Sequence, residues 1–100
     1  MLPVSIPYHE LDSLCAEYHI VRIRLFGSVL RTDFRPDSDV DILVDFAPDA
    51  HTTLLDLSAV QRQLEQMLGR QVDLGTPDGL SPYIRERVLQ TAQVIYERRE

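Results

Sequence analysis

Residues 25–46 read LFGSVLRTDFRPDSDVDILVDF, and this stretch decides the fold. The pair Gly27 and Ser28 ends one apolar segment, and a second apolar segment opens with Asp39 and Asp41. Side chains alternate between the two faces of a strand, so we expect both carboxylates to point the same way, about 7 Å apart along the backbone. Two carboxylates on one face, beside a turn of small residues, are suited to a divalent cation and a phosphate. The stretch therefore predicts a site for Mg²⁺ and a nucleoside triphosphate.

The composition indicates a single globular domain. The chain has 100 residues, of which 44% are apolar, and a domain of this size buries roughly 60–70% of the surface of its unfolded chain. The formal net charge of −6 argues against a broad nucleic-acid surface, so no direct nucleic-acid binding is expected. No apolar run reaches the roughly 18 residues of a membrane span, no signal peptide is visible, and Cys15 has no second cysteine to pair with. We expect residues 1–100 to form one domain in the cytoplasm.

Periodicity and capping residues predict the other elements. Helical spacing of apolar residues predicts three helices: one begins near Ser5, one lies between a Thr53–Asp56 capping box and Gly69, and one begins at Ser81. Alternating or apolar runs predict strands at 21–25, 40–46, 71–74 and 94–96, with a helical turn at 29–31 and a loop at 75–79. This order predicts a compact α/β or α+β domain, in which helices cover a small mixed sheet.

Several side chains are assigned to the core or to solvent. We expect Asp45 to be solvated, although it shares the strand parity of Asp41, because it lies over 10 Å farther along at about 3.3 Å per residue. The core is expected to include Cys15, the apolar face of the second helix and that of the third: Leu54, Leu57, Val60, Leu64, Met67, Ile84, Val88 and Leu89.

Asp73 is a further candidate for the site. It sits between two apolar residues on the strand at 71–74, and an unpaired carboxylate in a buried strand is costly. A bound metal or a role as a base would explain its place, and a strand-end carboxylate facing water is the alternative.

Taken together, these residues carry a resemblance to a known family. A Gly-Ser pair, ten intervening residues, Asp-x-Asp and a later Asp on a strand resemble the signature of polymerase β-type nucleotidyltransferases. More closely, Phe-Gly-Ser-x-x-Arg at 26–31, Ser-Asp-x-Asp-Ile-Leu-Val-x-Phe at 38–46 and Gly-Arg-x-Val-Asp-Leu at 69–74 resemble the minimal nucleotidyltransferases, the antitoxins of HEPN/MNT toxin–antitoxin pairs. The resemblance implies a polymerase β-like nucleotidyltransferase fold.

The resemblance also implies a metal site and a catalytic role for three carboxylates. Asp39 and Asp41 would bridge two Mg²⁺ ions, roughly 3.5–4 Å apart in sites of this kind. Asp73 would be the third carboxylate, which binds the catalytic metal and helps to deprotonate the attacking hydroxyl.

Phosphate binding is assigned to the Gly-Ser turn. Gly27 has no Cβ, so its backbone can approach a polyphosphate closely, and the N–H groups that follow favour an anion. Ser28 adds a hydroxyl group for a phosphate oxygen. Arg31 matches the family's arginine and either steadies phosphate or pairs with an acidic neighbour.

The function that the resemblance implies is transfer of AMP from ATP to a tyrosine hydroxyl of a partner HEPN ribonuclease toxin, with release of pyrophosphate. The modification would silence the toxin, and the two proteins would form a hetero-oligomer. Two alternatives are an antitoxin that acts by docking alone, and a nucleotidyltransferase that modifies the hydroxyl of a small molecule. An adjacent gene for a small all-helical protein with an Arg-x₄₋₆-His motif would favour the toxin–antitoxin function.

Overall fold

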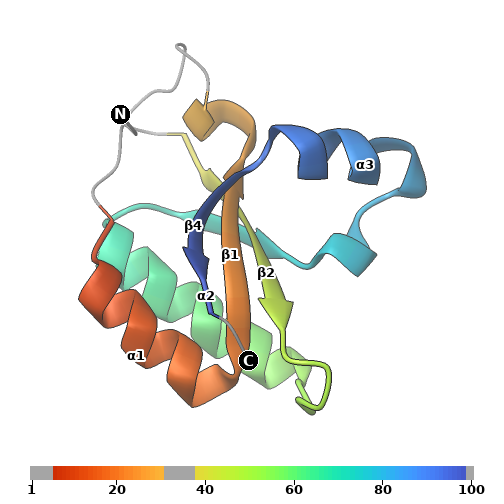
Figure 1. Cartoon of the computed structure of the whole chain (residues 1–100). Coiled ribbons are helices and arrows are strands. Elements are labelled where there is room, and N and C mark those ends of the chain that lie inside the picture. The colour runs from red at the N-terminus through yellow and green to blue at the C-terminus, as the bar shows by residue number, and fades with distance from the viewer. Residues whose placement is uncertain (1–5, 31–37, 99–100) are drawn as a thin grey trace.

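The computed structural model describes residues 6–30 and 38–98. Three helices and four strands follow one another in the order α1 (Tyr8–Tyr18), β1 (Ile20–Phe26), β2 (Val40–Phe46), α2 (Leu54–Leu68), β3 (Val72–Gly75), α3 (Pro82–Thr91) and β4 (Gln93–Glu97) (Figure 1). Two 3-10 turns, η1 (Gly27–Leu30) and η2 (Pro77–Gly79), follow β1 and β3. The expected mixed α/β class is confirmed. Ser5, Arg31 and residues 32–37 lie outside the described residues.

The strands form one mixed sheet in the order β3-β2-β1-β4. Strand β1 is antiparallel to both β2 and β4, whereas β2 and β3 are parallel neighbours. Parallel neighbours need a crossover connection, and α2 provides it. This arrangement puts β2, the strand that follows Asp39, at the centre of the sheet beside β3.

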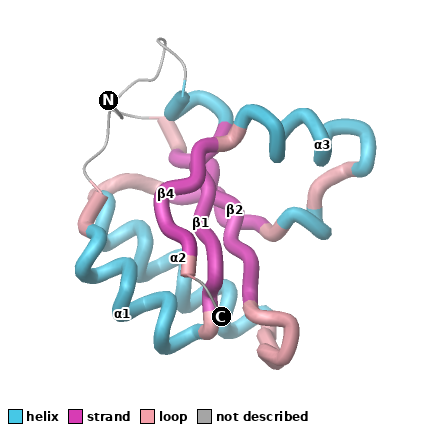
Figure 2. The backbone as a smooth tube through the Cα atoms, in the orientation of Figure 1, coloured by secondary structure: helices cyan, strands magenta, loops and turns pink. Residues whose placement is uncertain are grey.

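The core lies between the sheet and helices α1 and α2, which pack together on one face of the sheet (Figure 2). The strands and the two helices contribute apolar side chains that are almost fully buried: Leu11, Leu14, Cys15, Ile23, Leu25, Val40, Ile42, Val44, Val60 and Leu64. Cys15 is a core residue as expected, and its burial raises the pKa of the thiol to about 12.

Local capping chemistry sets the bounds of α2. Thr53 Oγ1 accepts a hydrogen bond from the backbone N–H of Asp56 at 3.2 Å, and Asp56 Oδ2 accepts one from the N–H of Thr53 at 3.0 Å. These bonds satisfy donors that a helix leaves unpaired in its first turn. At the other end, Gly69 takes a left-handed conformation with φ of +67°. Both capping predictions are confirmed.

Two expected core residues are exposed. Leu54, the first residue of α2, is 82% exposed, because the stripe of α2 that faces the core begins one turn later, at Leu57. Ile84 is 48% exposed, because α3 stands apart from α1 and α2 (Figure 1) and contributes no buried residue. Within residues 6–30 and 38–98, none of the helices has the length and apolar character to cross a membrane.

Candidate active site

The candidate site lies on the sheet face turned away from α1 and α2. We call it the second face and define it by Arg24, Asp41, Leu43, Asp45 and Asp73. These residues alternate along their strands with core residues, and residues opposite one another in a sheet project to the same side. The second face therefore carries most of the polar side chains of the central strands.

Asp41 and Asp73 are neighbours across the second face. Asp41 is in register with Phe26 on β1 and with Asp73 on β3. Neighbouring strands lie about 4.8 Å apart, so the two carboxylates start from adjacent backbone positions. Asp41 is half-buried and Asp73 is exposed. The structure thus brings together two of the three predicted carboxylates, which are 32 residues apart in the sequence.

Asp73 is exposed, so the prediction that its carboxylate lies in a buried strand is wrong. β3 lies at the edge of the sheet, and only the side that carries Val72 faces the core. Asp73 points to the opposite side and is solvated. Its place beside Asp41 comes from the parallel pairing of β2 and β3, not from a buried environment.

Gly27 lies directly against Asp41. Its φ of +75° is a left-handed conformation, which costs residues with a Cβ roughly 1–2 kcal/mol. A Cβ at this position would overlap Asp41 Oδ2 and would lie 3.2 Å from Asp41 Cγ. The absence of a side chain at Gly27 is therefore what allows the end of β1 and the Asp41 carboxylate to approach each other so closely.

The other predicted site residues are only partly placed. Asp39 is exposed and precedes the first residue of β2. The backbone of Ser28 lies in η1, its side chain is not described, and Arg31 lies outside the described residues. Among the residues that the structure describes, no three His, Cys, Asp or Glu side chains are arranged to hold a metal ion. Mg²⁺ in nucleotide sites is commonly held by one or two protein carboxylates together with phosphate oxygens and water, and Asp41 beside Asp73 fits such a site.

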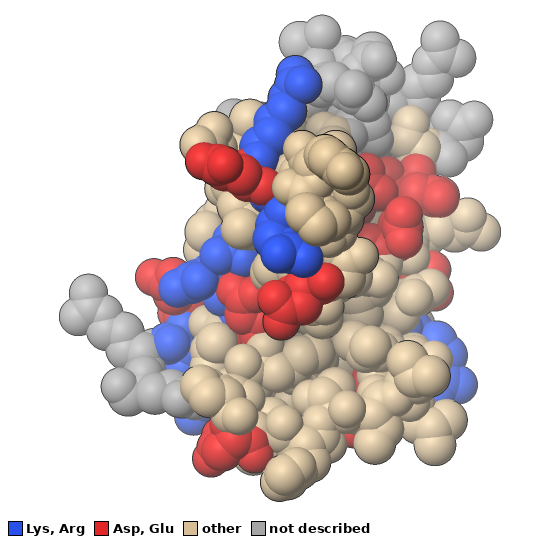
Figure 3. Space-filling view, turned by 90° about the vertical axis from the view of Figure 1, so that its right-hand side faces the viewer, with Lys and Arg blue, Asp and Glu red and all other residues tan. Residues whose placement is uncertain are grey.

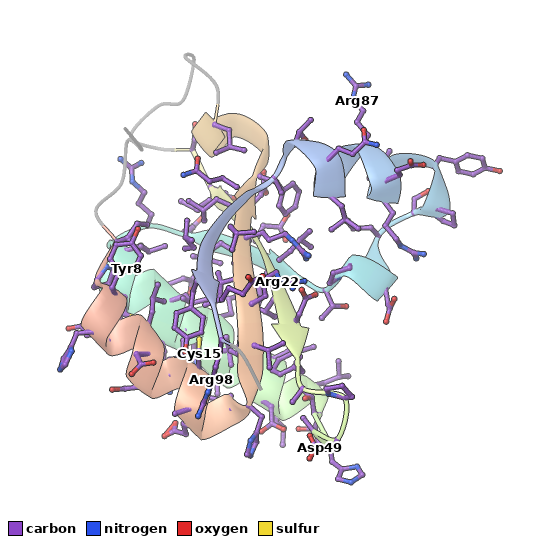
Figure 4. The ribbon with its side chains drawn as sticks, in the orientation of Figure 1. Tyr8, Cys15, Arg22, Asp49, Arg87 and Arg98 are labelled. Atoms are coloured by element: carbon purple, nitrogen blue, oxygen red, sulfur yellow. The ribbon has the colours of Figure 1, made fainter. Side chains whose placement is uncertain are left out.

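An ion-pair row follows the carboxylates along the second face. Asp45 Oδ2 accepts hydrogen bonds from Arg24 Nη1 at 3.0 Å and from Arg22 Nη1 at 3.3 Å. Arg22 Nε donates to Glu97 Oε2 at 2.6 Å, and this bond is the main reason that the pKa of Arg22 is raised. Figure 4 shows Arg22 over the central strands.

Asp45 was expected to be solvated, and that expectation is wrong. Its side chain is only 21% exposed, because the two arginines of β1 close over it. The alternation of arginine with apolar residues in β1 could have identified Arg22 and Arg24 as partners of Asp45. It places both arginines on one face of β1, and that face lies beside Asp45 because β1 and β2 are neighbouring strands.

Known proteins are similar to this chain in both sequence and architecture. Residues 11–95 match the model of the nucleotidyltransferase domain family. A relative from Thermococcus cleftensis, the protein adenylyltransferase MntA, is 38% identical over 79 residues, which are 79% of this chain and 76% of that protein. A Methanocaldococcus jannaschii protein, whose name proposes the same activity, is 36% identical over 83% of this chain and 87% of its own length.

Solved structures agree with these relatives. The structure of a protein proposed to be a minimal nucleotidyltransferase superimposes with a TM-score of 0.69 at 45% identity, over 84% of each chain. A toxin–antitoxin crystal structure with AMP-PNP superimposes with a TM-score of 0.71 over 92% of this chain and 74% of that one. Its identity is 20%, so this second likeness concerns the fold alone.

Proposed function

The chain belongs to the nucleotidyltransferase domain family, and from that premise we propose that it transfers AMP from ATP to a tyrosine hydroxyl of a HEPN toxin and thereby neutralises it. The observation that carries the proposal is the pair Asp41 and Asp73, in register on the second face beneath Gly27. The relatives named as protein adenylyltransferases support AMP as the transferred group and a protein as the acceptor. The use of ATP and the single unpaired thiol also fit a cytoplasmic location.

The Gly27 turn is assigned to the triphosphate. Because Gly27 leaves no side chain over Asp41, phosphate oxygens can reach both the backbone of η1 and the carboxylates. Ser28 adds a hydroxyl donor, and Arg31 adds a cation that offsets the phosphate charge.

We assign two roles to the carboxylates: they would hold two Mg²⁺ ions and accept the proton of the attacking tyrosine hydroxyl. Asp39 and Asp41 would hold both ions, and Asp73 would share one of them with Asp41. When bound, Mg²⁺ neutralises charge on the triphosphate and polarises the α-phosphate. The tyrosine oxygen attacks the α-phosphorus, its bond to phosphorus forms as the bond to the bridging oxygen breaks, and pyrophosphate leaves. Asp73 accepts the phenolic proton directly or through water.

The decisive experiment measures the mass of the acceptor. Incubation with a purified HEPN toxin as acceptor, ATP and Mg²⁺ should add units of about 329 Da, the mass of one AMP residue, to that protein. Asp41→Asn and Asp73→Asn should each lower the rate at least about 10²-fold, the scale of losing a positioned acid–base or metal-binding group. Asp49→Asn is the matched control, because Asp49 is exposed in the loop after β2 (Figure 4).

The outcomes separate the alternatives. A toxin that is neutralised with no change of mass would mean that docking alone is the mechanism. Full activity of Asp73→Asn would remove Asp73 from the site. A thermal-shift series should also show that Asp73→Asn weakens the stabilisation by ATP with Mg²⁺, which follows mass action on the folded protein.

A further inference from the structure

Helix α3 is unusual in this fold because none of its residues is buried. Tyr83 is 96% exposed and Ile84 is 48% exposed, although isoleucine is apolar and the tyrosine ring is apolar except for its hydroxyl group. The helix has 10 residues, and helices shorter than about 12 residues are marginal in water unless tertiary contacts hold them. Of its apolar side chains, Val88 and Leu89 are half-buried, so contacts besides a buried apolar stripe must help to hold α3 in place.

Arg85 anchors α3 to the rest of the domain. Its Nε donates to the carbonyl oxygen of Pro77 at 2.8 Å, and its Nη2 donates to those of Leu80 at 3.0 Å and Asp78 at 3.2 Å. Ser81 caps the first turn by accepting from the N–H of Tyr83. One guanidinium group thus binds three backbone carbonyls of the η2 segment, so α3 is held in a defined position while Tyr83 and Ile84 stay exposed.

The clamp connects α3 to the candidate active site. The chain passes from Asp73 through Gly75 into η2 within four residues, and η2 contacts β2. A cleft of about 280 Å³ opens at the same place, lined by Val44, Asp45, Phe46, Thr76, Pro77 and Asp78. The second face, this cleft and α3 therefore form one continuous region.

The exposed part of α3 combines apolar and charged groups. Besides Tyr83 and Ile84 it carries Arg87, which points away from the domain in Figure 4. The face that carries α3 shows acidic and basic side chains around an uncharged area (Figure 3). Tyrosine and arginine are among the residue types enriched at the energetic centres of protein interfaces.

We propose that Tyr83, Ile84 and Arg87, the α3 surface, dock the acceptor protein and so bring its tyrosine to the carboxylates of the second face. The inference rests on the proposed AMP transfer and names the surface that selects its acceptor. Charge favours this occupant over a second copy of the chain. Two copies carry −6 each and repel, whereas a ribonuclease must present a basic surface to its RNA and is attracted by the net negative charge of this chain. Arg87 is itself a cation, so at the α3 surface it requires an acidic or carbonyl acceptor on the partner.

The test compares two double variants by isothermal titration calorimetry with the HEPN toxin that serves as acceptor, without nucleotide. Tyr83→Ser with Ile84→Ser should weaken binding about tenfold or more. Leu54→Ser with Leu55→Ser is the matched control, since both leucines are 82% exposed at the start of α2, and it should bind as the wild type does. Arg85→Met, which releases α3 but leaves its outer surface intact, should also weaken binding.

A second readout separates docking from chemistry. In AMP-transfer assays the α3 double variant should raise the KM for the acceptor by the same factor, with the thermal stabilisation by ATP and Mg²⁺ unchanged. Unchanged binding by that variant would overturn the inference, as would a self-association of the wild-type chain that the variant abolishes. If the wild type binds the HEPN protein but transfers no AMP, the proposed function fails, while the calorimetry still decides the docking surface.

Discussion

Substitution of Gly27 by alanine separates the geometry of the site from the stability of the fold. The φ of +75° at Gly27 makes any Cβ unfavourable by roughly 1–2 kcal/mol. The new methyl group would also lie 3.2 Å from Asp41 Cγ and would overlap Oδ2. Because a carboxylate is the end of a rotatable side chain, Asp41 should turn away at a cost of about 0.5–1.5 kcal/mol. We expect a total loss of about 1.5–3.5 kcal/mol in the free energy of unfolding.

Gly69→Ala is the matched control. Gly69 has a φ of +67°, and a Cβ there would meet nothing within 4 Å, so this variant has the backbone strain without the clash. Urea denaturation should show a loss of about 1–2 kcal/mol for Gly69→Ala. The clearer difference should lie in AMP transfer, which should fall at least about 10²-fold in Gly27→Ala, the scale of a displacement of about 1 Å in a reacting group, and stay near the wild-type rate in Gly69→Ala. Equal activity of the two variants would refute the placement of Asp41 in the site.

Three further predictions concern stability. Asp45→Asn removes the negative charge shared by two arginines and should lower the free energy of unfolding in urea by about 1–3 kcal/mol, whereas Glu97→Gln, at a more exposed pair, should cost under about 1 kcal/mol; equal losses would contradict the shared role of Asp45. Thr53→Ala should cost about 1 kcal/mol through loss of the α2 cap, and no loss would mean that the cap is redundant. Burial raises the pKa of Cys15 from 9.0 to about 12, so the unfolded thiol ionises first. Its contribution is complete below pH 9 and is lost as the pH rises toward 12, by about 1.4 kcal/mol per pH unit. Urea midpoints between pH 8 and 10 should fall more steeply in the wild type than in Cys15→Ala.

Local sequence signals predicted the elements well where the local chain decides the outcome. The strand at 40–46 has the predicted bounds, because its mostly apolar residues, interrupted only by Asp41 and Asp45, suit a strand at the centre of a sheet. The ends of α2 were predicted because hydrogen bonds between residues three or four apart form there regardless of the rest of the fold.

The arrangement of the site depended on contacts that no local pattern specifies. Parity along one strand placed Asp41 and Asp45 on a common face, but it could not show that Arg22 and Arg24 of β1 would lie beside Asp45. The pairing of Asp41 with Asp73 requires β2 and β3 to be parallel neighbours. In this arrangement β3 is an edge strand that buries only one of its faces. Its other face is left in water, so Asp73 is exposed.

Helix α3 shows why a helical pattern alone does not identify a core. A stripe of apolar residues at a spacing of three or four indicates that one side of a helix avoids water, and it does not say which surface covers that side. In α2 the covering surface is the sheet of the same chain, so Val60 and Leu64 are buried. In α3 the Arg85 clamp holds the helix beside η2, and Ile84 is left exposed. The misassigned residue therefore belongs to the surface that we propose binds the acceptor, where the apolar partner comes from another protein.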